Sequence, residues 1–546
     1  MAFVKYDVVI IGAGAGGGVA ADVLARAGKR VLLLERGPAT LALASTGRDH
    51  LKNQRLSAYG VNAGPSADNP RVFVDWKTGE ERTVLPHEGG YCNNAAGVGG
   101  GTAVYGAQAW RFHPLDFRMA STYGVPEGSS LADWPIGYDD LLPYYERVER
   151  ELGVAGDASR MTHLPPYNAP YPMPPFSQNA QGRAVQRGAE ALGWATLPPP
   201  LAVNTVPFDG RPACIQCQHC VGFACPVNAK NGSQNTFIPL ALKSGNCELA
   251  AGVITGRLEV DTNGRVTGVR FFDAYGISVS VLAEVVVLAG GAVETARLLL
   301  NSRSVVHPKG IGNQWDQVGL NLQGHYYPTA LGLFAEDIWD GQGPGPSTAI
   351  TRFNHGNDGI IGGAMLADDF VQVPIMTWKG RREPGLTFWG QTAKDWMRVN
   401  YRRVTDVKGP VQEIPTPDAC VSIDNSVTDR WGIPVARLSG TSHPETVRTA
   451  AFMFDRAAEW LKASGAVKVW GSAPGRNLSG GQHQAGTCRM GDDPKTSVVD
   501  RFCRVHGHDN LYLGDGSVHV TNGGFNPFLT IMALAYRTAE QIAADW

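Results

Sequence analysis

The chain has 546 residues, of which 43% are apolar and 18% charged, and its formal net charge is −2. This length suggests about two to four domains with ample core. The near-neutral charge argues against nucleic acid or an anionic membrane surface as a partner held by bulk charge. The first predicted strand starts within about ten residues of the N-terminus, which leaves no room for a secretory signal. No apolar run reaches the ~18 residues of a membrane span, so we expect a cytoplasmic protein.

Residues 8–35 predict a strand, a glycine turn, a helix and a second strand that ends in an acid. The turn holds Gly12, Gly14 and Gly17 in the spacing G-x-G-x-x-G. In dinucleotide-binding folds these glycines allow a tight turn, backbone approach to a pyrophosphate, and packing of the helix on the strand. The helix N-terminus would face the phosphates, and Glu35 can accept hydrogen bonds from a ribose. The alternative is a glycine-rich turn in an ordinary α/β core.

Three segments follow in the first half of the chain. Residues 93–111 are again rich in glycine, and residues 178–195 predict an amphipathic helix. Between residues 254 and 288 we expect two strands that run through an Asn263-Gly264 turn, a strong hairpin signal. These elements lie between stretches dense in proline and glycine, which we interpret as loops.

Two later segments repeat the pattern of strand, glycine turn and helix. They are residues 285–302 and the end of the chain, where a strand is expected at Leu511–Leu513. Elements of a dinucleotide-binding fold therefore occur at the start, middle and end. We predict an α/β class (α+β overall), with a discontinuous Rossmann-like domain and a second domain of an antiparallel sheet covered by helices. The first comprises residues 1–120, 200–302 and 480–546, and the second comprises residues 121–199 and 303–479.

Four of the nine cysteines form one tight run, Cys214, Cys217, Cys220 and Cys225, followed by proline. The spacing C-x2-C-x2-C-x4-C-P resembles the iron–sulfur run of bacterial ferredoxins, whose last gap is one residue shorter. An odd number of cysteines does not describe a secreted disulfide framework. The alternatives are an iron–sulfur cluster, a structural zinc ion, or thiols or a disulfide in a packed loop. A cluster would pass electrons singly to a protein acceptor.

Seven segments, taken in order, make the chain resemble the glucose–methanol–choline (GMC) flavin oxidoreductases over nearly its full length. They are residues 12–17 with Glu35, 97–111, 290–302, 318–325, 423–437, 483–491 and 513–540. Within the family, residues 96–106 and 220–236 look most similar to bacterial pyranose oxidases and glycoside 3-oxidases. The weakest match is 326–408, where we expect the sheet and lid that choose the substrate.

The resemblance implies a bound FAD. Some fungal relatives attach the flavin through a histidine at the position of Val104, so we expect non-covalent binding here. The glycine turn and the resemblance together place the FAD contacts at Gly12, Gly14, Gly17, Glu35, Gly99, Gly100, Thr102, Ala103, Tyr105, Gly106, Ala107, Val253, Gly290, Asp515, Gly516, Asn526, Pro527 and Phe528.

The family position of the catalytic base is held by His483, and the second position of the pair is held by Asn526. Removal of a hydroxyl proton during hydride transfer needs a base with a pKa near 7, which suits histidine. The amide of Asn526 can orient the substrate oxygen. Asn526 could instead cap the last helix, with Pro527 at the first helical position. We interpret His325 and His519 as structural.

We therefore expect an FAD-dependent enzyme that oxidises a secondary hydroxyl of a pyranose sugar or glycoside to a ketone, at C3 or alternatively C2, by hydride transfer to flavin N5. Oxygen or a quinone-type acceptor would receive the electrons. Residues 340–410 mix Trp with Asn, Gln, Arg and Asp, which suits a sugar better than a greasy alcohol. The alternatives are a GMC dehydrogenase of another alcohol and a flavo-iron–sulfur electron-transfer protein with a protein partner. The oligomeric state stays open.

Overall fold

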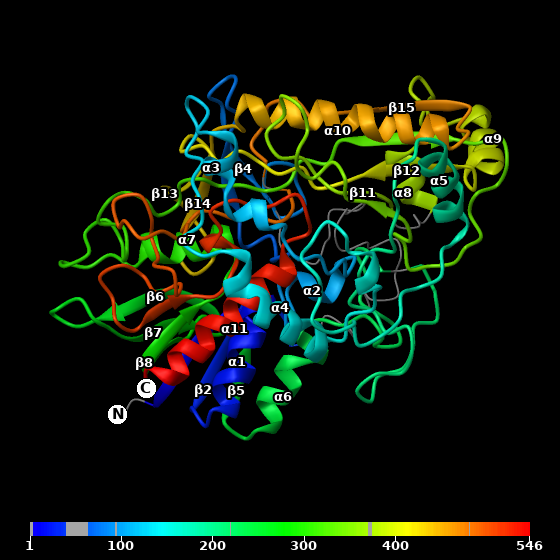
Figure 1. The fold of residues 1–546 in the computed structure, drawn as a ribbon. Helices are drawn as coiled ribbons and strands as arrows, with labels where there is room; N and C mark the ends of the chain where they lie inside the picture. The colour runs from blue at the N-terminus through cyan, green and yellow to red at the C-terminus, as the bar shows by residue number, and fades with distance from the viewer. Residues whose placement is uncertain (1–3, 40–63, 93–94, 219, 370–373, 480) are drawn as a thin grey trace.

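The computed structural model describes residues 4–39, 64–92, 95–218, 220–369, 374–479 and 481–546 (Figure 1). These residues form three β-sheets of seven, five and four strands, with helices packed around them. The expected mixed α/β class is confirmed. Within these ranges no helix is both long enough and apolar enough to cross a membrane. The proposed division into two discontinuous domains stays a prediction.

The first sheet joins segments from the start, middle and end of the chain. Its strands run in the order β5 (Cys247–Ala251), β2 (Val31–Glu35), β1 (Lys5–Ile11), β8 (Ser278–Leu288), β7 (Val266–Phe272) and β6 (Ile254–Val260), and β16 (Leu511–Leu513) also pairs with β8. Strands β5, β2, β1, β8 and β16 are parallel. Every residue of β2 is buried, as expected of a parallel strand covered on both faces. The predicted strand 511–513 is confirmed.

The expectation of two strands between residues 254 and 288 was wrong, because three form. Strands β6 and β7 make the hairpin through the predicted Asn263-Gly264 turn. Gly264 adopts a φ of +86° there. A second antiparallel pairing then leads into β8, whose first half pairs with β7 and whose second half, from Leu282 to Leu288, pairs with β1. One long strand thus connects the hairpin to the parallel part of the sheet.

Helices cover the parallel strands. They are α1 (Ala15–Arg26), α4 (Tyr138–Leu152), α6 (Phe237–Lys243), α7 (Ala292–Asn301) and α11 (Phe528–Ala544). Helix α11 packs on both α1 and α4, and α6 packs on the other side of α1; Figure 1 shows α1 and α11 side by side. The last helix of the chain therefore lies directly against the first, which follows from their shared run of small and apolar residues.

The second sheet is antiparallel and is the most distant from the termini (Figure 1). Its order is β10 (Ala349–Ile350), β11 (Leu366–Asp368), β12 (Val404–Lys408), β9 (Thr329–Leu333) and β15 (Lys468–Ser472). Ala330 of β9 packs with α10 (Pro444–Ala463) and α5 (Ala180–Ala191). Leu331 and Leu333 point to the other face and pack with Trp396, as the two-residue period of a strand requires. The predicted helix over 178–195 is confirmed as α5.

The remaining elements are short or lie at the edges. The third sheet has the order β13 (Cys420–Thr428), β14 (Pro434–Ser439), β3 (Arg71–Val74) and β4 (Glu81–Val84). The other helices are α2 (Gly101–Val104), α3 (Met119–Tyr123), α8 (Pro374–Gly380) and α9 (Gln391–Asn400). Single turns of 3₁₀-helix occur at Pro114–Phe117, Ala158–Arg160, Ser233–Asn235 and Gly516–Val518.

Helix α1 approaches two backbone segments so closely that no side chain fits between them. A Cβ atom on Gly17 would lie 1.8 Å from the carbonyl oxygen of Gly12. A Cβ atom on Gly16 would lie 1.7 Å from the carbonyl oxygen of Gly514. In both cases the neighbour is backbone, which cannot rotate away as a side chain can. These two contacts hold the start of α1 against the β1 turn and against the turn after β16.

We expect Gly17→Ala to destabilise the protein by at least about 2 kcal/mol, because the added methyl group overpacks a backbone contact. The free energy of unfolding in urea measures this. Gly14→Ala is the matched control, since a Cβ on Gly14 would meet no atom within 4 Å. Equal stability of the two variants would contradict the packing role of Gly17.

Candidate active site

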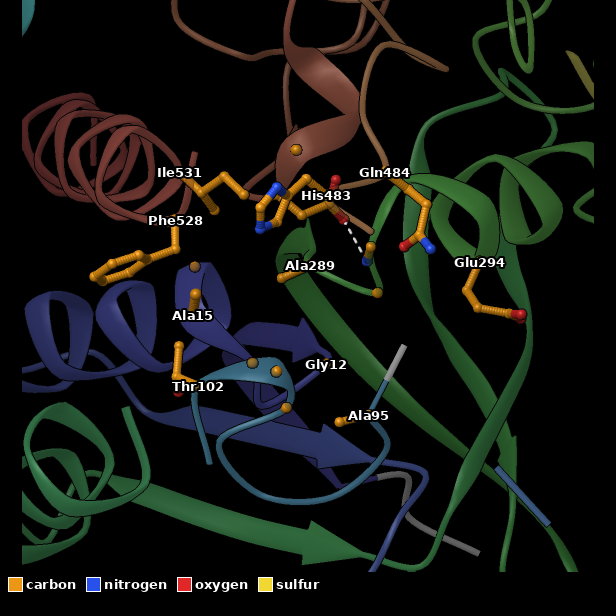
Figure 2. A pocket seen from close by; sticks show the side chains of 18 of the residues that line it. Gly12, Ala15, Ala95, Thr102, Ala289, Glu294, His483, Gln484, Phe528 and Ile531 are labelled. Carbon is orange, nitrogen blue, oxygen red and sulfur yellow. Dashed lines mark hydrogen bonds between the residues drawn. The ribbon is translucent and has the colours of Figure 1, made fainter. Parts of the chain in front are cut away.

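A cavity of about 400 Å³ opens at the carboxyl ends of the parallel strands. Its walls come from the β1–α1 turn, the ends of β2 and β8, the α2 segment, the second sheet, and the segments around residues 481–484, 515–516 and 526–531. In Figure 2, His483 and Gln484 lie in the upper part of the view and Gly12 and Thr102 in the lower part. Parallel α/β sheets bind ligands at this edge, so the position supports the predicted dinucleotide site.

The glycine turn forms the floor of one end of this cavity. Gly12 has a φ of +105°, and a Cβ there would lie 2.3 Å from the carbonyl oxygen of Ala289. Gly14 is the N-cap of α1, and no side chain caps this helix end. Because a Cβ on Gly14 would meet no protein atom within 4 Å, its Cα faces open space in the cavity. Backbone N–H groups at an uncapped helix N-terminus suit a pyrophosphate.

Glu35 lies at the end of β2 and lines the cavity, as predicted. One carboxylate oxygen accepts the Ala13 N–H at 3.0 Å, and the other accepts the Gly37 N–H at 2.8 Å. These bonds fix the carboxylate between the two loops. Each carboxylate oxygen has a second lone pair, which leaves capacity for a ribose hydroxyl. Val253, whose N–H donates to the carbonyl of Glu35 at 3.0 Å, also lines this end.

Asp515 connects the end of the chain to the middle. Its Oδ2 accepts the Gly291 N–H at 2.9 Å and the Thr295 hydroxyl at 2.6 Å, both at the start of α7. A carboxylate at a helix N-terminus is stabilised by the helix dipole.

Tyr105 and Phe528 both line the cavity, and their rings pack edge-to-face with centroids 4.9 Å apart.

Most of the predicted FAD contacts line this single cavity. They are Gly12, Gly14, Glu35, Gly100, Thr102, Tyr105, Gly106, Ala107, Val253, Gly290, Asp515, Gly516, Asn526, Pro527 and Phe528. Gly17, Gly99 and Ala103 do not line it. Gly17 packs on Gly12, and Gly99 donates its N–H to the carbonyl of Ala13 at 2.8 Å. These residues shape the backbone of the cavity from behind.

A largely buried charged cluster, whose members were not among the predicted site residues, lies at one end of the cavity. Glu294 pairs with Arg71 at 2.5 Å, Arg297 at 3.2 Å and Arg36 at 3.4 Å. Burial alone would raise the pKa of Glu294, but the three guanidinium groups hold it below its ordinary value. Arg36 and Glu294 both line the cavity next to Glu35, and Figure 2 shows the carboxylate of Glu294 at its right-hand side.

His483 lines the opposite end and is held by two neighbours. Its Nδ1 lies 2.8 Å from Nδ1 of His325 and 3.4 Å from the hydroxyl of Tyr327. His325 is buried, and its Nε2 lies 3.1 Å and 2.9 Å from the carbonyl oxygens of Asn522 and Gly523. Burial lowers the pKa of His325 to about 4. The structural interpretation of His325 from the sequence missed this contact with the candidate base.

The backbone around His483 is unusual and is held by one side chain. His483 has a φ of +58°, a conformation that few non-glycine residues adopt. Residues held in such conformations cluster at functional sites. The Asn522 side chain donates to the carbonyl of His483 at 2.8 Å and to the carbonyl of Gly324 at 3.2 Å. It also contacts Nδ1 of His519 at 3.1 Å. Asn522 thereby links the segments that carry both histidines.

Asn526 faces the cavity and does not cap the last helix. Helix α11 begins at Phe528, its N-cap is Pro527, and no side chain makes a capping bond. The structure therefore does not support the alternative in which Asn526 caps this helix. Its Oδ1 is buried and has no hydrogen-bond partner in the described structure. An unsatisfied buried amide oxygen on a cavity wall needs a ligand or water as its partner.

The wall contributed by the second sheet is polar and charged. Asp368 ends β11, Asp369 follows it, and Lys408 ends β12. Lys408 Nζ lies 2.5 Å from Asp369 and 3.2 Å from Asp406. Burial raises the pKa of Asp368 to about 7, although Ser347 and Thr348 donate backbone bonds to it. The motifs did not mark these residues, because they lie in the part of the chain with the weakest match.

The cysteine run lies in a loop behind the α2 segment. Cys214, Cys217, Cys220 and Cys225 are free thiols. Among the residues that the structure describes, no three His, Cys, Asp or Glu side chains are grouped as a metal site requires. The iron–sulfur and zinc interpretations therefore have no structural support. Lys230 is buried beside this loop and donates to the carbonyl oxygens of Tyr105 at 2.9 Å and Phe223 at 2.8 Å, which ties the loop to the cavity wall.

Comparison with known proteins agrees with this geometry. Family models described as GMC oxidoreductase match residues 6–327 and 415–535. The chain is 31% identical to 6'''-hydroxyparomomycin C oxidase of Streptomyces lividus, over 99% of this chain and 91% of that protein. It is 30% identical to the fructose dehydrogenase large subunit of Gluconobacter japonicus, over 99% and 98%.

The fold is also found among solved structures. The crystal structure of pyridoxine 4-oxidase from Mesorbium loti superposes with a TM-score of 0.61 at 18% identity and covers 98% of both chains. At this identity the likeness concerns the fold. The family models and the two relatives show that the chain belongs to the GMC oxidoreductase family of FAD-binding enzymes.

Proposed function

We propose that this enzyme oxidises a secondary hydroxyl of a pyranose sugar or glycoside to a ketone. The observation that carries the proposal is the continuity of one cavity from the glycine turn to His483 and Asn526. A dinucleotide seated on the turn would extend towards the candidate base within the same enclosed space. The two relatives named for an aminoglycoside and a sugar support a carbohydrate substrate.

The residues of the cavity suit FAD. The uncapped end of α1 and the open face of Gly14 would hold the pyrophosphate. Glu35 would hold the adenosine ribose, with Arg36 and Glu294 beside it. When bound, FAD supplies a two-electron acceptor for hydride. Residue 104 is a valine, so we propose that the cofactor is held without a covalent bond at that position.

His483 and Asn526 are the residues that we assign to the substrate carbinol. His483 takes the hydroxyl proton as the C–H bond is broken, which avoids a free alkoxide. Asn526 donates from its amide to the same oxygen and holds the C–H bond in position. The remaining hydroxyls of a sugar would face Asp368, Asp369 and Lys408. An apolar alcohol would displace water from that charged wall without replacing its hydrogen bonds, at a cost in free energy.

The site of oxidation that we propose is C3, with C2 as the second candidate. This choice rests on the resemblance to glycoside 3-oxidases and pyranose oxidases that we inferred from residues 96–106 and 220–236. Oxygen or a quinone is the acceptor that we propose for the electrons, since the relatives include one protein named an oxidase and one named a dehydrogenase.

Anaerobic addition of glucose or methyl glucoside should bleach the oxidised-flavin band of the purified enzyme. Mass spectrometry and NMR of the product then identify the oxidised carbon. A ketone at C3 is the expected product. An aldehyde would move the reaction to a primary hydroxyl, and a flavin band that no sugar bleaches would turn the search to other alcohols.

Gly14→Val should prevent retention of FAD, because its side chain would occupy the space left for the pyrophosphate. The measurement is the ratio of FAD to protein after purification. Thermal unfolding of the apoprotein is the control, and it should match that of wild-type apoprotein. A yellow, active Gly14→Val variant would contradict this placement of the cofactor.

His483→Ala should keep FAD bound but slow its reduction by sugar about 10²- to 10⁴-fold, the usual contribution of a general base. Anaerobic stopped-flow spectroscopy measures the rate. The flavin spectrum and FAD content serve as controls for an intact site. A rate within a few-fold of wild type would remove His483 as the base.

A further inference from the structure

We infer that His325 is a positioning residue that fixes the tautomer of His483, with the proton on Nδ1 and the lone pair on Nε2. The inference rests on the proposed role of His483 as base. It is drawn from the contacts of the two ring nitrogens of His325. One nitrogen contacts two backbone carbonyl oxygens, and the other contacts His483.

The first contact decides which nitrogen of His325 carries hydrogen. Nε2 lies 3.1 Å from the carbonyl oxygen of Asn522 and 2.9 Å from that of Gly523. Carbonyl oxygens only accept hydrogen bonds. If Nε2 carried no hydrogen, its lone pair would face the lone pairs of both carbonyl oxygens in a buried site. Nε2 of His325 therefore carries the hydrogen and is shared between the two carbonyls.

The second contact passes this assignment to His483. Burial keeps His325 neutral at ordinary pH, since its pKa is lowered to about 4. A neutral imidazole has one N–H, so Nδ1 of His325 carries a lone pair. The facing Nδ1 of His483, at 2.8 Å, must then be the donor. In its neutral form His483 then has its lone pair on Nε2, which is the form that a base needs to accept a proton.

Four neighbouring titratable groups lie farther from this contact or are bonded elsewhere. The Tyr327 hydroxyl lies farther from the same Nδ1, at 3.4 Å. Asp116, which acts on His325 through charge, is held by His355 at 2.8 Å and by the backbone of His113 at 2.7 Å. Glu413 bonds the Gly324 N–H at 3.0 Å rather than either ring. His519 faces the Asn522 side chain, and burial lowers its pKa to about 4.

A neutral imidazole behind the base has a chemical consequence. Many catalytic histidines are oriented by a carboxylate, which also stabilises the imidazolium. Here the group behind Nδ1 orients the ring but carries no charge, so it raises the pKa of His483 less than a carboxylate would. The proton leaves the substrate hydroxyl for Nε2, and the resulting cation keeps its Nδ1–H bond to His325.

Two substitutions at His325 separate orientation from simple packing. His325→Gln keeps an acceptor for His483 and N–H donors for the two carbonyls. His325→Leu fills similar space but keeps neither. We expect the Leu variant to lose at least about tenfold in the rate of flavin reduction, and the Gln variant to recover most of that loss. FAD content and thermal unfolding of both variants control for folding.

The pH profile of flavin reduction supplies a readout that packing would not move. Without the acceptor at Nδ1 the protonated form of His483 loses a hydrogen bond, so its pKa falls. The acid limb of the profile should therefore move to lower pH in His325→Leu and return in His325→Gln. A Leu variant with unchanged rate and limb would overturn the inference. Equal impairment of both variants with an unmoved limb would also overturn it.

Nitrogen-15 NMR of histidine-labelled resting enzyme separates this inference from the proposed substrate. The signals of His483 are assigned by their loss in His483→Ala. A protonated Nδ1 and a bare Nε2 support the inference even if no sugar reduces the flavin. A protonated Nε2 would refute it even if sugars are oxidised rapidly.

Discussion

The site depends on the close packing of helix α1 against the backbone of two other segments. Gly17 on Gly12 and Gly16 on Gly514 bring the first helix within reach of both the first strand and the last turn of the chain. A side chain at either position would separate these segments. Because the cavity walls come from the start, middle and end of the sequence, this contact decides whether they share one space. The carboxylates of Glu35 and Asp515 then fix the loops around it.

The two ends of the cavity handle charge in different ways. Beside Glu35, three arginines surround Glu294, and their attraction outweighs the cost of burying its carboxylate. At the other end His325 is buried behind the partly buried His483, and burial keeps His325 neutral. An anionic cofactor suits the arginine-rich end. Proton removal suits the end where the base is uncharged and its lone pair is oriented.

The strained backbone at His483 fits this division. A non-glycine residue at a φ of +58° costs free energy, and the protein retains it where Asn522 bonds both the His483 and Gly324 carbonyls. Asn522 belongs to the same C-terminal segment as Asn526. One short stretch of chain therefore positions both members of the proposed catalytic pair, and its carbonyl groups also set the protonation of His325.

The sequence by itself determined the elements whose signals are local. The G-x-G-x-x-G turn with Glu35, the strand 511–513 and the helix after residue 178 follow from spacing within a few residues, and the ordered motifs indicated the family. Only the tertiary structure decided what depends on distant partners: the contact of His325 with His483, the cluster of Glu294 with three arginines, and the charged wall of Asp369 and Lys408. It also placed Asn526 on the cavity wall without the alternative capping bond to the last helix, and left the cysteine run without a metal-like grouping in the described residues. The physical reason is that hydrogen bonds and ion pairs form between atoms close in space, and residues 158 positions apart in the chain, such as the two histidines, carry no local pattern that reveals their contact.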